Sequence, residues 1–301
     1  MQGGFAPLKK GDVAMSPNQQ IRKEARGQLR GHWPQALAVT SVCLAAVLLF
    51  TILREGIAVL SGVIPLASAL GDQPLEIANP YAYLFISSLV TLVQLLVMAP
   101  LLLGAVKWFF RRARGEEVPV SVIFDYFSGR ALGRALVFLG QALVRLAGWG
   151  ALSFLPGLAC AYFAEKNNGS TVSVTAGNML GSLAAVLLAL GTLLFVPMML
   201  RYFLAPFLFT EDDALPAAES FRLSVERMSG FRGHVFVLGC TFIGWLLLCL
   251  FAFPLLYVLP YLAAAMANCA KWILFEYHRA QEARAFYQEQ AGRWQPPAGQ
   301  Q

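Results

Sequence analysis

The stretch VFVLGCTFIGWLLLCLFAFPLLYVLPYLAAAMANCA, residues 235–270, contains no charged side chain over 36 positions. At about 1.5 Å per residue, one helix of this length would measure about 54 Å, whereas the hydrocarbon core of a bilayer is about 30 Å thick. The stretch therefore predicts two membrane crossings that fold back on each other near residues 251–254. Such a hairpin is typical of a helical membrane protein.

Four further apolar stretches long enough for one crossing each lie upstream, at 36–53, 81–106, 135–163 and 179–200. We therefore expect an all-α membrane protein with six transmembrane helices. A shorter apolar stretch, 56–70, contains Pro65 and either extends the first span or lies at the membrane surface. The expected organisation is a cytoplasmic segment 1–35, a membrane domain 36–270, and a cytoplasmic C-terminal helix and tail 271–301.

The composition supports this class, since 57% of the residues are hydrophobic and 13% are charged. Soluble domains contain about 45–50% apolar and about 25% charged residues. The difference excludes a soluble enzyme, a disordered chain and a secreted disulfide scaffold. The five cysteines lie inside or beside the apolar stretches and form no C-x-x-C pair, so neither a zinc site nor a redox motif is predicted.

The distribution of basic residues predicts the orientation. Of the 23 Lys and Arg residues, 20 lie in the segments 1–35, 107–134 and 201–234 and in the tail from 271, and two lie in the alternate loops. Lys and Arg accumulate in cytoplasmic loops, so both termini are expected to be cytoplasmic, with the protein in the plasma membrane. A nucleic-acid binder would gather this charge into one patch, so no nucleic-acid partner is expected.

An amphipathic helix is predicted in the N-terminal segment. Ser16-Pro17 is a typical helix start, and Ile21, Ala25 and Leu29 then recur every four residues among basic side chains. Such a helix can lie on an anionic leaflet, either as an insertion anchor or as a lipid sensor. Membrane lipids are therefore expected partners.

Two more amphipathic helices are expected, at about 217–228, before span five, and at about 271–290. The acidic Glu211-Asp212-Asp213 precedes the first of them. Carboxylates in that place suit the positive end of a helix dipole. Three adjacent acids alone supply no enclosing geometry for a cation, so no metal site is predicted.

Arg145 lies inside the stretch 135–163, where a charge is costly and marks a candidate functional site. At about 100° per residue, Arg130, Arg134, Gln141 and Arg145 fall within about 60° of one another on a helix. This polar stripe has two interpretations. Either it faces a vestibule for an anionic solute or a lipid headgroup, or the helix begins at the interface and its arginines reach back to water.

A second pattern concerns small residues. Gly177, Gly181, Ala185 and Ala189 recur every four residues in and just before the stretch 179–200. Small residues at this spacing let helix backbones approach closely. We interpret them as a helix-packing face, either within the chain or between subunits.

No catalytic constellation is visible. The nucleotide-binding, serine-hydrolase and zinc-protease motifs are absent, and no Asp or Glu lies within a predicted span. No catalytic residue and no cofactor are therefore predicted. We expect a non-enzymatic membrane component, either an assembly partner of another membrane protein, a homo-oligomer, or a transporter- or channel-like protein. The alternative is a lipid-modifying or peptidase-type enzyme with an unrecognised site.

Residues 21–33, IRKEARGQLRGHW, are similar to the opening I-K-x-x-A-K-x-x-L-x-G-x-W of a bacterial multipass family, domain of unknown function 975. Further similar segments follow in order at 201–206, 218–224, 228–230, 242–245 and 260–261. The resemblance implies a bacterial integral membrane protein of about six helices with cytoplasmic termini. It implies no established activity and adds no catalytic residue.

Overall fold

The computed structural model describes residues 16–65, 77–167, 174–249 and 253–293, and within these ranges it contains helices and no strand. The elements are α1 (Pro17–Leu29), α2 (Trp33–Leu60), α4 (Pro80–Ala113), the 3-10 helix η1 (Val120–Phe127), α5 (Gly129–Asn167), α6 (Val174–Leu200), α7 (Ala205–Glu211), α8 (Ala217–Arg227), α9 (Arg232–Cys240), α10 (Ile243–Leu248) and α11 (Phe253–Arg293).

Five helices in this part of the chain are long and apolar enough to cross a membrane. They are α2, α4, α5, α6 with its continuation into α7, and α11. The chain is therefore an all-helical protein of the membrane-embedded type. Five of the six predicted crossings correspond to these helices.

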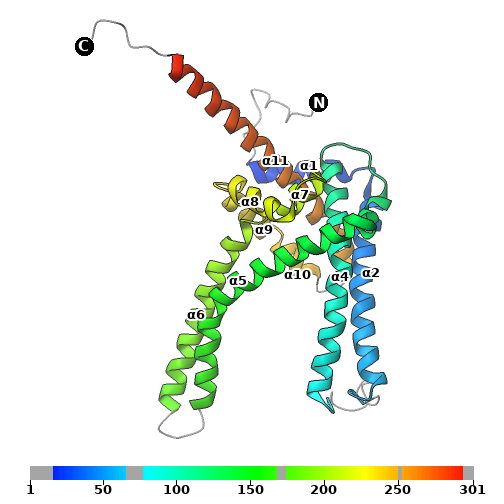
Figure 1. Ribbon diagram of the computed structural model, residues 1–301, viewed down its shortest axis with the longest axis vertical. Coiled ribbons are helices and arrows are strands. Elements are labelled where there is room, and N and C mark those ends of the chain that lie inside the picture. Colours follow the sequence, from blue (N-terminus) through cyan, green and yellow to red (C-terminus); the bar gives the residue numbers. More distant parts are fainter. Residues whose placement is uncertain (1–15, 66–76, 168–173, 250–252, 294–301) are drawn as a thin grey trace, which may run out of the picture.

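The long helices form two antiparallel pairs, α2 with α4 and α5 with α6 (Figure 1). The pairs meet at one end of the molecule and diverge toward the other (Figure 1). At the end where they meet lie α1, η1, α7 and α8, together with the C-terminal end of α4 and the N-terminal end of α5. We call this the basic end, since Lys107, Arg111, Arg112 and Arg114 close α4 there.

The charge-free stretch 235–270 folds back, as its length predicts. Ring contacts pair its two limbs in antiparallel register: Phe242 with Tyr261 at 5.2 Å and Trp245 with Tyr257 at 6.4 Å between ring centroids. Just outside the stretch, Phe231 contacts Trp272 at 5.6 Å in the same register. The first limb is not one continuous helix, because a turn separates α9 from α10. The hydroxyl of Thr241 donates to the carbonyl of Leu238 at 2.7 Å there, a bond that bends helices. A complete sixth crossing stays a prediction, and the expected turn at 251–254 lies largely outside the described residues.

Two expected boundaries differ from the structure. α2 continues to Leu60, so the first part of 56–70 extends the first span, and residues 66–70 lie outside the described residues. The helix expected at 271–290 is not separate, because α11 runs unbroken over 41 residues, or about 62 Å. Neither glycine nor proline occurs between Pro260 and Gly292, so nothing in the sequence ends the helix at the expected boundary.

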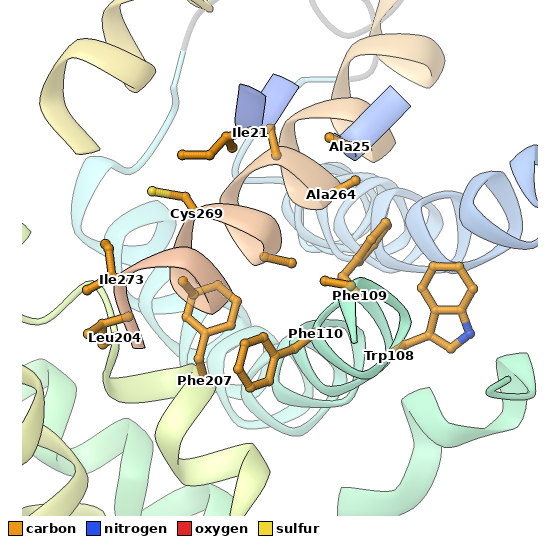
Figure 2. Close-up of a cluster of buried hydrophobic side chains, with 14 of the residues drawn as sticks. Ile21, Ala25, Trp108, Phe109, Phe110, Leu204, Phe207, Ala264, Cys269 and Ile273 are labelled. Carbon is orange, nitrogen blue, oxygen red and sulfur yellow. The ribbon is translucent and has the colours of Figure 1, made fainter. Parts of the chain in front are cut away.

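The largest hydrophobic core lies at the basic end, where α1 packs against α4 and α11. Figure 2 shows Ile21 and Ala25 of α1 beside Ala264 of α11, with the aromatic side chains of α4 next to them. Ile21, Ala25 and Leu29 are fully buried. The expectation that this face lies on a lipid leaflet is therefore wrong for the folded protein. The alanines of α11 provide the physical reason, since small side chains let α1 approach closely.

Polar side chains fix the position of α1 on this core. The Gln28 side chain donates from Nε2 to the Phe109 carbonyl at 3.3 Å. Its Oε1 accepts a hydrogen bond from Asn268, whose amide also donates to the Ala264 carbonyl at 2.8 Å. Asn268 is buried, so these bonds satisfy a group that would otherwise oppose folding.

Candidate anion-binding site

The predicted polar stripe lies on the N-terminal half of α5, where the structure divides it into two parts. Arg130 and Arg134 lie near η1 and α7, whereas Gln141 and Arg145 lie farther along α5 beside α8. Of the three arginines, Arg134 and Arg145 have described partners on other elements of the basic end. The two parts have different partners and are described in turn.

The partners that the structure gives for Arg145 are Gln141 of the same helix and two aromatic rings from other elements. Its Nη1 donates to the Gln141 carbonyl at 2.9 Å and to the Gln141 side chain. Its guanidinium lies over the ring of Phe221 at 4.3 Å and near the ring of Tyr202 at 5.9 Å. The pairing with Gln141 follows from the sequence spacing, whereas the two aromatic partners were missed. Phe221 could have been found, since it lies on the apolar face of the predicted helix 217–228.

Arginines and aromatic rings alternate along this side of α5. Arg134 lies over the ring of Phe209 of α7 at 4.8 Å. One turn later, Phe138 contacts Phe209 at 4.8 Å and Phe221 of α8 at 4.9 Å. Cation–π pairs contribute about 0.5–2 kcal/mol each, depending on desolvation. The stripe therefore joins α5 to α7 and α8.

Arg130 and Arg134 also line a pocket of about 520 Å³ at the basic end. The other residues that line it are Lys107 of α4, Asp125 and Tyr126 of η1, Ser128, Ala131 of α5, and Asp213 between α7 and α8. Sequence reasoning missed Lys107, Asp125, Tyr126 and Asp213 as site residues. Lys107 was recognised only as one of the basic residues that mark orientation.

The charges of the pocket are partly paired. Lys107 is 7% exposed, and its Nζ lies 2.8 Å from Oδ2 of Asp125. Arg134 Nη1 lies 3.1 Å from Oδ1 of Asp213. Arg130 makes no hydrogen bond or ion pair with any residue that the structure describes. Three cations against two carboxylates leave a net charge of +1, located on Arg130.

Tyr126 contributes a buried hydroxyl to the pocket. The residue is 1% exposed, and its Oη has no hydrogen-bond partner among the described residues. Burial, together with the negative charge of Asp213, raises the pKa of the Tyr126 hydroxyl to about 12. The hydroxyl is therefore protonated at neutral pH and is a donor without an acceptor. Such a group costs about 1–3 kcal/mol unless a ligand satisfies it.

Two glycines place η1 beside Lys107. A Cβ atom at Gly104 would lie 2.1 Å from the carbonyl oxygen of Ile123, so only glycine lets η1 lie directly on α4 there. Gly129, with φ of 48°, makes the turn from η1 into α5. Close contact and turn together bring Asp125 to Lys107 and Arg130 to the same pocket.

Three residues of the predicted small-residue face of α6 have no close packing partner among the described residues. A Cβ atom at Gly181 would meet nothing within 4 Å, and Ala185 and Ala189 are exposed. Gly177 belongs to α6, but its surroundings lie outside what the structure describes. Packing between subunits stays a prediction.

Other small residues bring α5 and α6 together. A Cβ atom at Gly191 would lie 2.1 Å from the Ser153 carbonyl oxygen, and one at Gly157 would lie 2.7 Å from the side chain of Leu188.

Among the residues that the structure describes, no group of three His, Cys, Asp or Glu side chains could hold a metal ion.

Comparison with known proteins gives one match. A family described as "Protein of unknown function (DUF975)" matches residues 15–274 and confirms the resemblance seen in the sequence. No curated protein and no solved structure matches the chain.

Proposed function

The chain belongs to the DUF975 family, and we propose that it is a non-enzymatic membrane protein that binds a phosphate group, carried by a lipid headgroup, in the pocket of Lys107, Tyr126 and Arg130. One observation carries this proposal: the buried Tyr126 hydroxyl shares a pocket with the exposed Arg130, and neither has a hydrogen-bond or ion-pair partner among the described residues. A phosphate oxygen satisfies both groups, because arginine and hydroxyl donors both bind phosphate well.

The location favours a lipid as the source of the phosphate. The pocket lies where α4 ends and α5 begins, at the junction between apolar helices and the basic segments. Lipid headgroups occupy this level of a bilayer, outside its hydrocarbon core of about 30 Å. Free phosphate has the same chemistry, and the experiment below separates the two sources.

We further propose six crossings with both termini cytoplasmic in a bacterial plasma membrane. The support is that α1 and the C-terminal part of α11 lie at the same end (Figure 1), which requires an even number of passes. In this arrangement α9 and α10 form the fifth, interrupted pass, and α11 forms the sixth. Reporter fusions test it: a reporter after residue 301 is expected to be active in the cytoplasm, and an external C-terminus would contradict it.

Lipid retention tests the headgroup site. The protein is purified in detergent with phosphatidylglycerol and phosphatidylcholine, and native mass spectrometry counts the lipids that remain bound. Arg130→Gln is expected to lower retained phosphatidylglycerol about tenfold, since one hydrogen bond to a charged group contributes about 1.5–3 kcal/mol. Arg222→Gln is the matched control, because Arg222 is an exposed arginine of α8 whose partners are Glu219 and Glu226.

Inorganic phosphate distinguishes the sources. If the lipid headgroup is the ligand, millimolar phosphate displaces little phosphatidylglycerol from the wild-type protein, because the bilayer or micelle also holds the lipid. Complete displacement by phosphate identifies a soluble phosphate as the ligand instead. Equal retention by wild type, Arg130→Gln and Arg222→Gln refutes the site.

A further inference from the structure

A second cavity, of about 530 Å³, lies between α2, α4 and α11. Each helix contributes side chains at helical spacing: α2 contributes Thr40, Cys43 and Val47, and α11 contributes Leu259, Ala263 and Met266. We call this cavity the apolar groove. Phe109 of α4 and Phe207 of α7 close it toward the basic end.

The side chains that line the groove offer no hydrogen bond to a water molecule. Its one hydroxyl, Thr40 Oγ1, donates to the carbonyls of Ala36 at 3.0 Å and Leu37 at 3.1 Å, within its own helix. The remaining lining side chains are aliphatic, aromatic or sulfur-containing. A buried water needs about two to four polar partners, so the groove suits an apolar occupant.

The groove opens toward the bilayer. Leu102 of α4 lines it and is 50% exposed, and α2, α4 and α11 are three of the helices apolar enough to span a membrane. At that depth the two available apolar occupants are a lipid chain and a helix of another protein. The groove and the surrounding bilayer are equally apolar, so shape decides between them.

The extent of the groove favours a lipid chain. Its lining covers about two turns of α2, from Thr40 to Val47, and about two turns of α11, from Leu259 to Met266. A spanning helix has at least five turns, so it would reach far beyond the groove. Met98 and Met266 line it with flexible thioether side chains, which adapt to a ligand of varied conformation.

We propose that the apolar groove binds one acyl chain of a membrane lipid, held between α2, α4 and α11. This site is separate from the headgroup pocket. Leu102 and Lys107 lie five residues apart on α4, which turns their side chains about 140° from each other. The groove inference therefore does not rest on the proposed phosphate site.

Photolabelling tests the groove. The protein is placed in nanodiscs of phosphatidylcholine that carries a diazirine in the middle of one acyl chain, and labelled peptides are mapped by mass spectrometry after illumination. In the wild type, residues 40–47 are expected to carry adducts that persist after dilution into nanodiscs of unlabelled lipid before illumination. Residues 48–52, whose leucines and isoleucine are exposed, report the freely exchanging surface lipid and lose their label on dilution.

Variants assign the label to the groove. Ala263→Trp fills the groove and is expected to lower the persistent label on residues 40–47 at least about fivefold, the ratio that corresponds to about 1 kcal/mol. Leu49→Trp is the matched control, because it adds an indole on the exposed side of α2 and leaves the label unchanged. Ala105→Phe fills the groove from α4 and replaces Ala263→Trp if that variant does not fold.

The outcomes separate the alternatives. Label that is lost equally from residues 40–47 and 48–52 on dilution, or that Ala263→Trp leaves unchanged, overturns the proposal. A dimer in the native mass spectrum that Ala263→Trp converts to monomer overturns it in favour of a helix from a second copy. Arg130→Gln is expected to keep the groove label, so the failure of one site is distinguishable from the failure of the other.

Discussion

The α11 and α5 helices are similarly apolar, and α6 is more apolar than either, but α11 is packed very differently from the α5–α6 pair. In α11, 61% of the most apolar 18-residue window is buried within the protein, against 11% in α5 and in α6. α11 packs against α1, α2 and α4, whereas α5 and α6 pack mainly against each other. In a bilayer an exposed leucine costs nothing, so apolar composition does not report burial. We call α11 with α1, α2 and α4 the packed region, and the α5–α6 pair the α5–α6 hairpin. The free energy of unfolding and the site geometry should therefore depend on the packed region far more than on the α5–α6 hairpin.

Replacing a fully buried aromatic residue of the packed region should have the largest effect. Trp108 of α4 is fully buried, and its Nε1 donates to the Val118 carbonyl at 3.2 Å. Trp108→Ala is expected to lower the free energy of unfolding by about 3–5 kcal/mol, through a cavity and a lost hydrogen bond. Leu155→Ala, at a 59% exposed position of α5, should change it by less than about 0.5 kcal/mol. Denaturation in mixed micelles measures both, and equal losses would remove the contrast.

Within the α5–α6 hairpin, the effect of a Gly→Ala substitution on stability should depend on the space around the glycine. Gly191→Ala places a Cβ against the Ser153 carbonyl and should destabilise the α5–α6 contact by about 1–3 kcal/mol. Gly181→Ala, in open space on the same helix, should stabilise α6 by about 0.5–1 kcal/mol. The same unfolding measurement compares them. Loss of stability in Gly181→Ala would indicate that a second subunit covers this face.

Arg145 tests how the hairpin is held to the basic end. Arg145→Met keeps the length of the side chain but removes the charge over Phe221, and should cost about 1–2 kcal/mol. Retained phosphatidylglycerol should stay unchanged, because Arg145 contacts aromatic rings of α8 and the link before α7 instead of lining the pocket. A loss of lipid with unchanged stability would reverse these two assignments and return the anion site to Arg145.

Tyr126→Phe should give the smallest effect at neutral pH. Removing an unpartnered buried hydroxyl should leave stability equal or raise it by less than about 1 kcal/mol. In the wild type the pKa of about 12 exceeds the ordinary value of 10, so the folded protein keeps a proton that the unfolded chain loses. Because burial disfavours the phenolate, this titration leaves the free energy of unfolding unchanged below pH 10 and lowers it as pH rises toward 12. Titrated unfolding curves should show this loss in the wild type and lack it in Tyr126→Phe.

The sequence predicts where the helices lie along the chain better than how they pack against one another. Long apolar runs and a Ser-Pro helix start are local properties, and they correctly predict five of the six expected spans, the fold-back of 235–270 and the start of α1 at Pro17. The break between α9 and α10 was missed, because no proline marks it in the sequence and Phe242 becomes buried only when the helices are packed. The continuity of α11 was missed because a change in polarity at Lys271 resembles a boundary and yet contains no helix breaker.

The candidate site was only partly predictable for a related reason. Arg130 and Arg134 share a helix, so periodicity places them together. Lys107 and Asp125 are 18 residues apart and meet only because Gly104 admits η1 against α4. The partnerless state of the Tyr126 hydroxyl depends on every neighbour at once, and no spacing rule describes that. Sites assembled between elements become visible only when the elements are packed.

The docking of α1 on α11 also determines the order in which the protein can be assembled during synthesis. Gln28 and its partner Asn268 are 240 positions apart. A ribosome adding about 5–20 residues per second needs about 12–48 s to reach the second from the first. Throughout that interval Ile21, Ala25 and Leu29 have no α11 to cover them. The packing of α1 therefore stays incomplete until the last helix has been made, although its contacts with α4 can form much earlier.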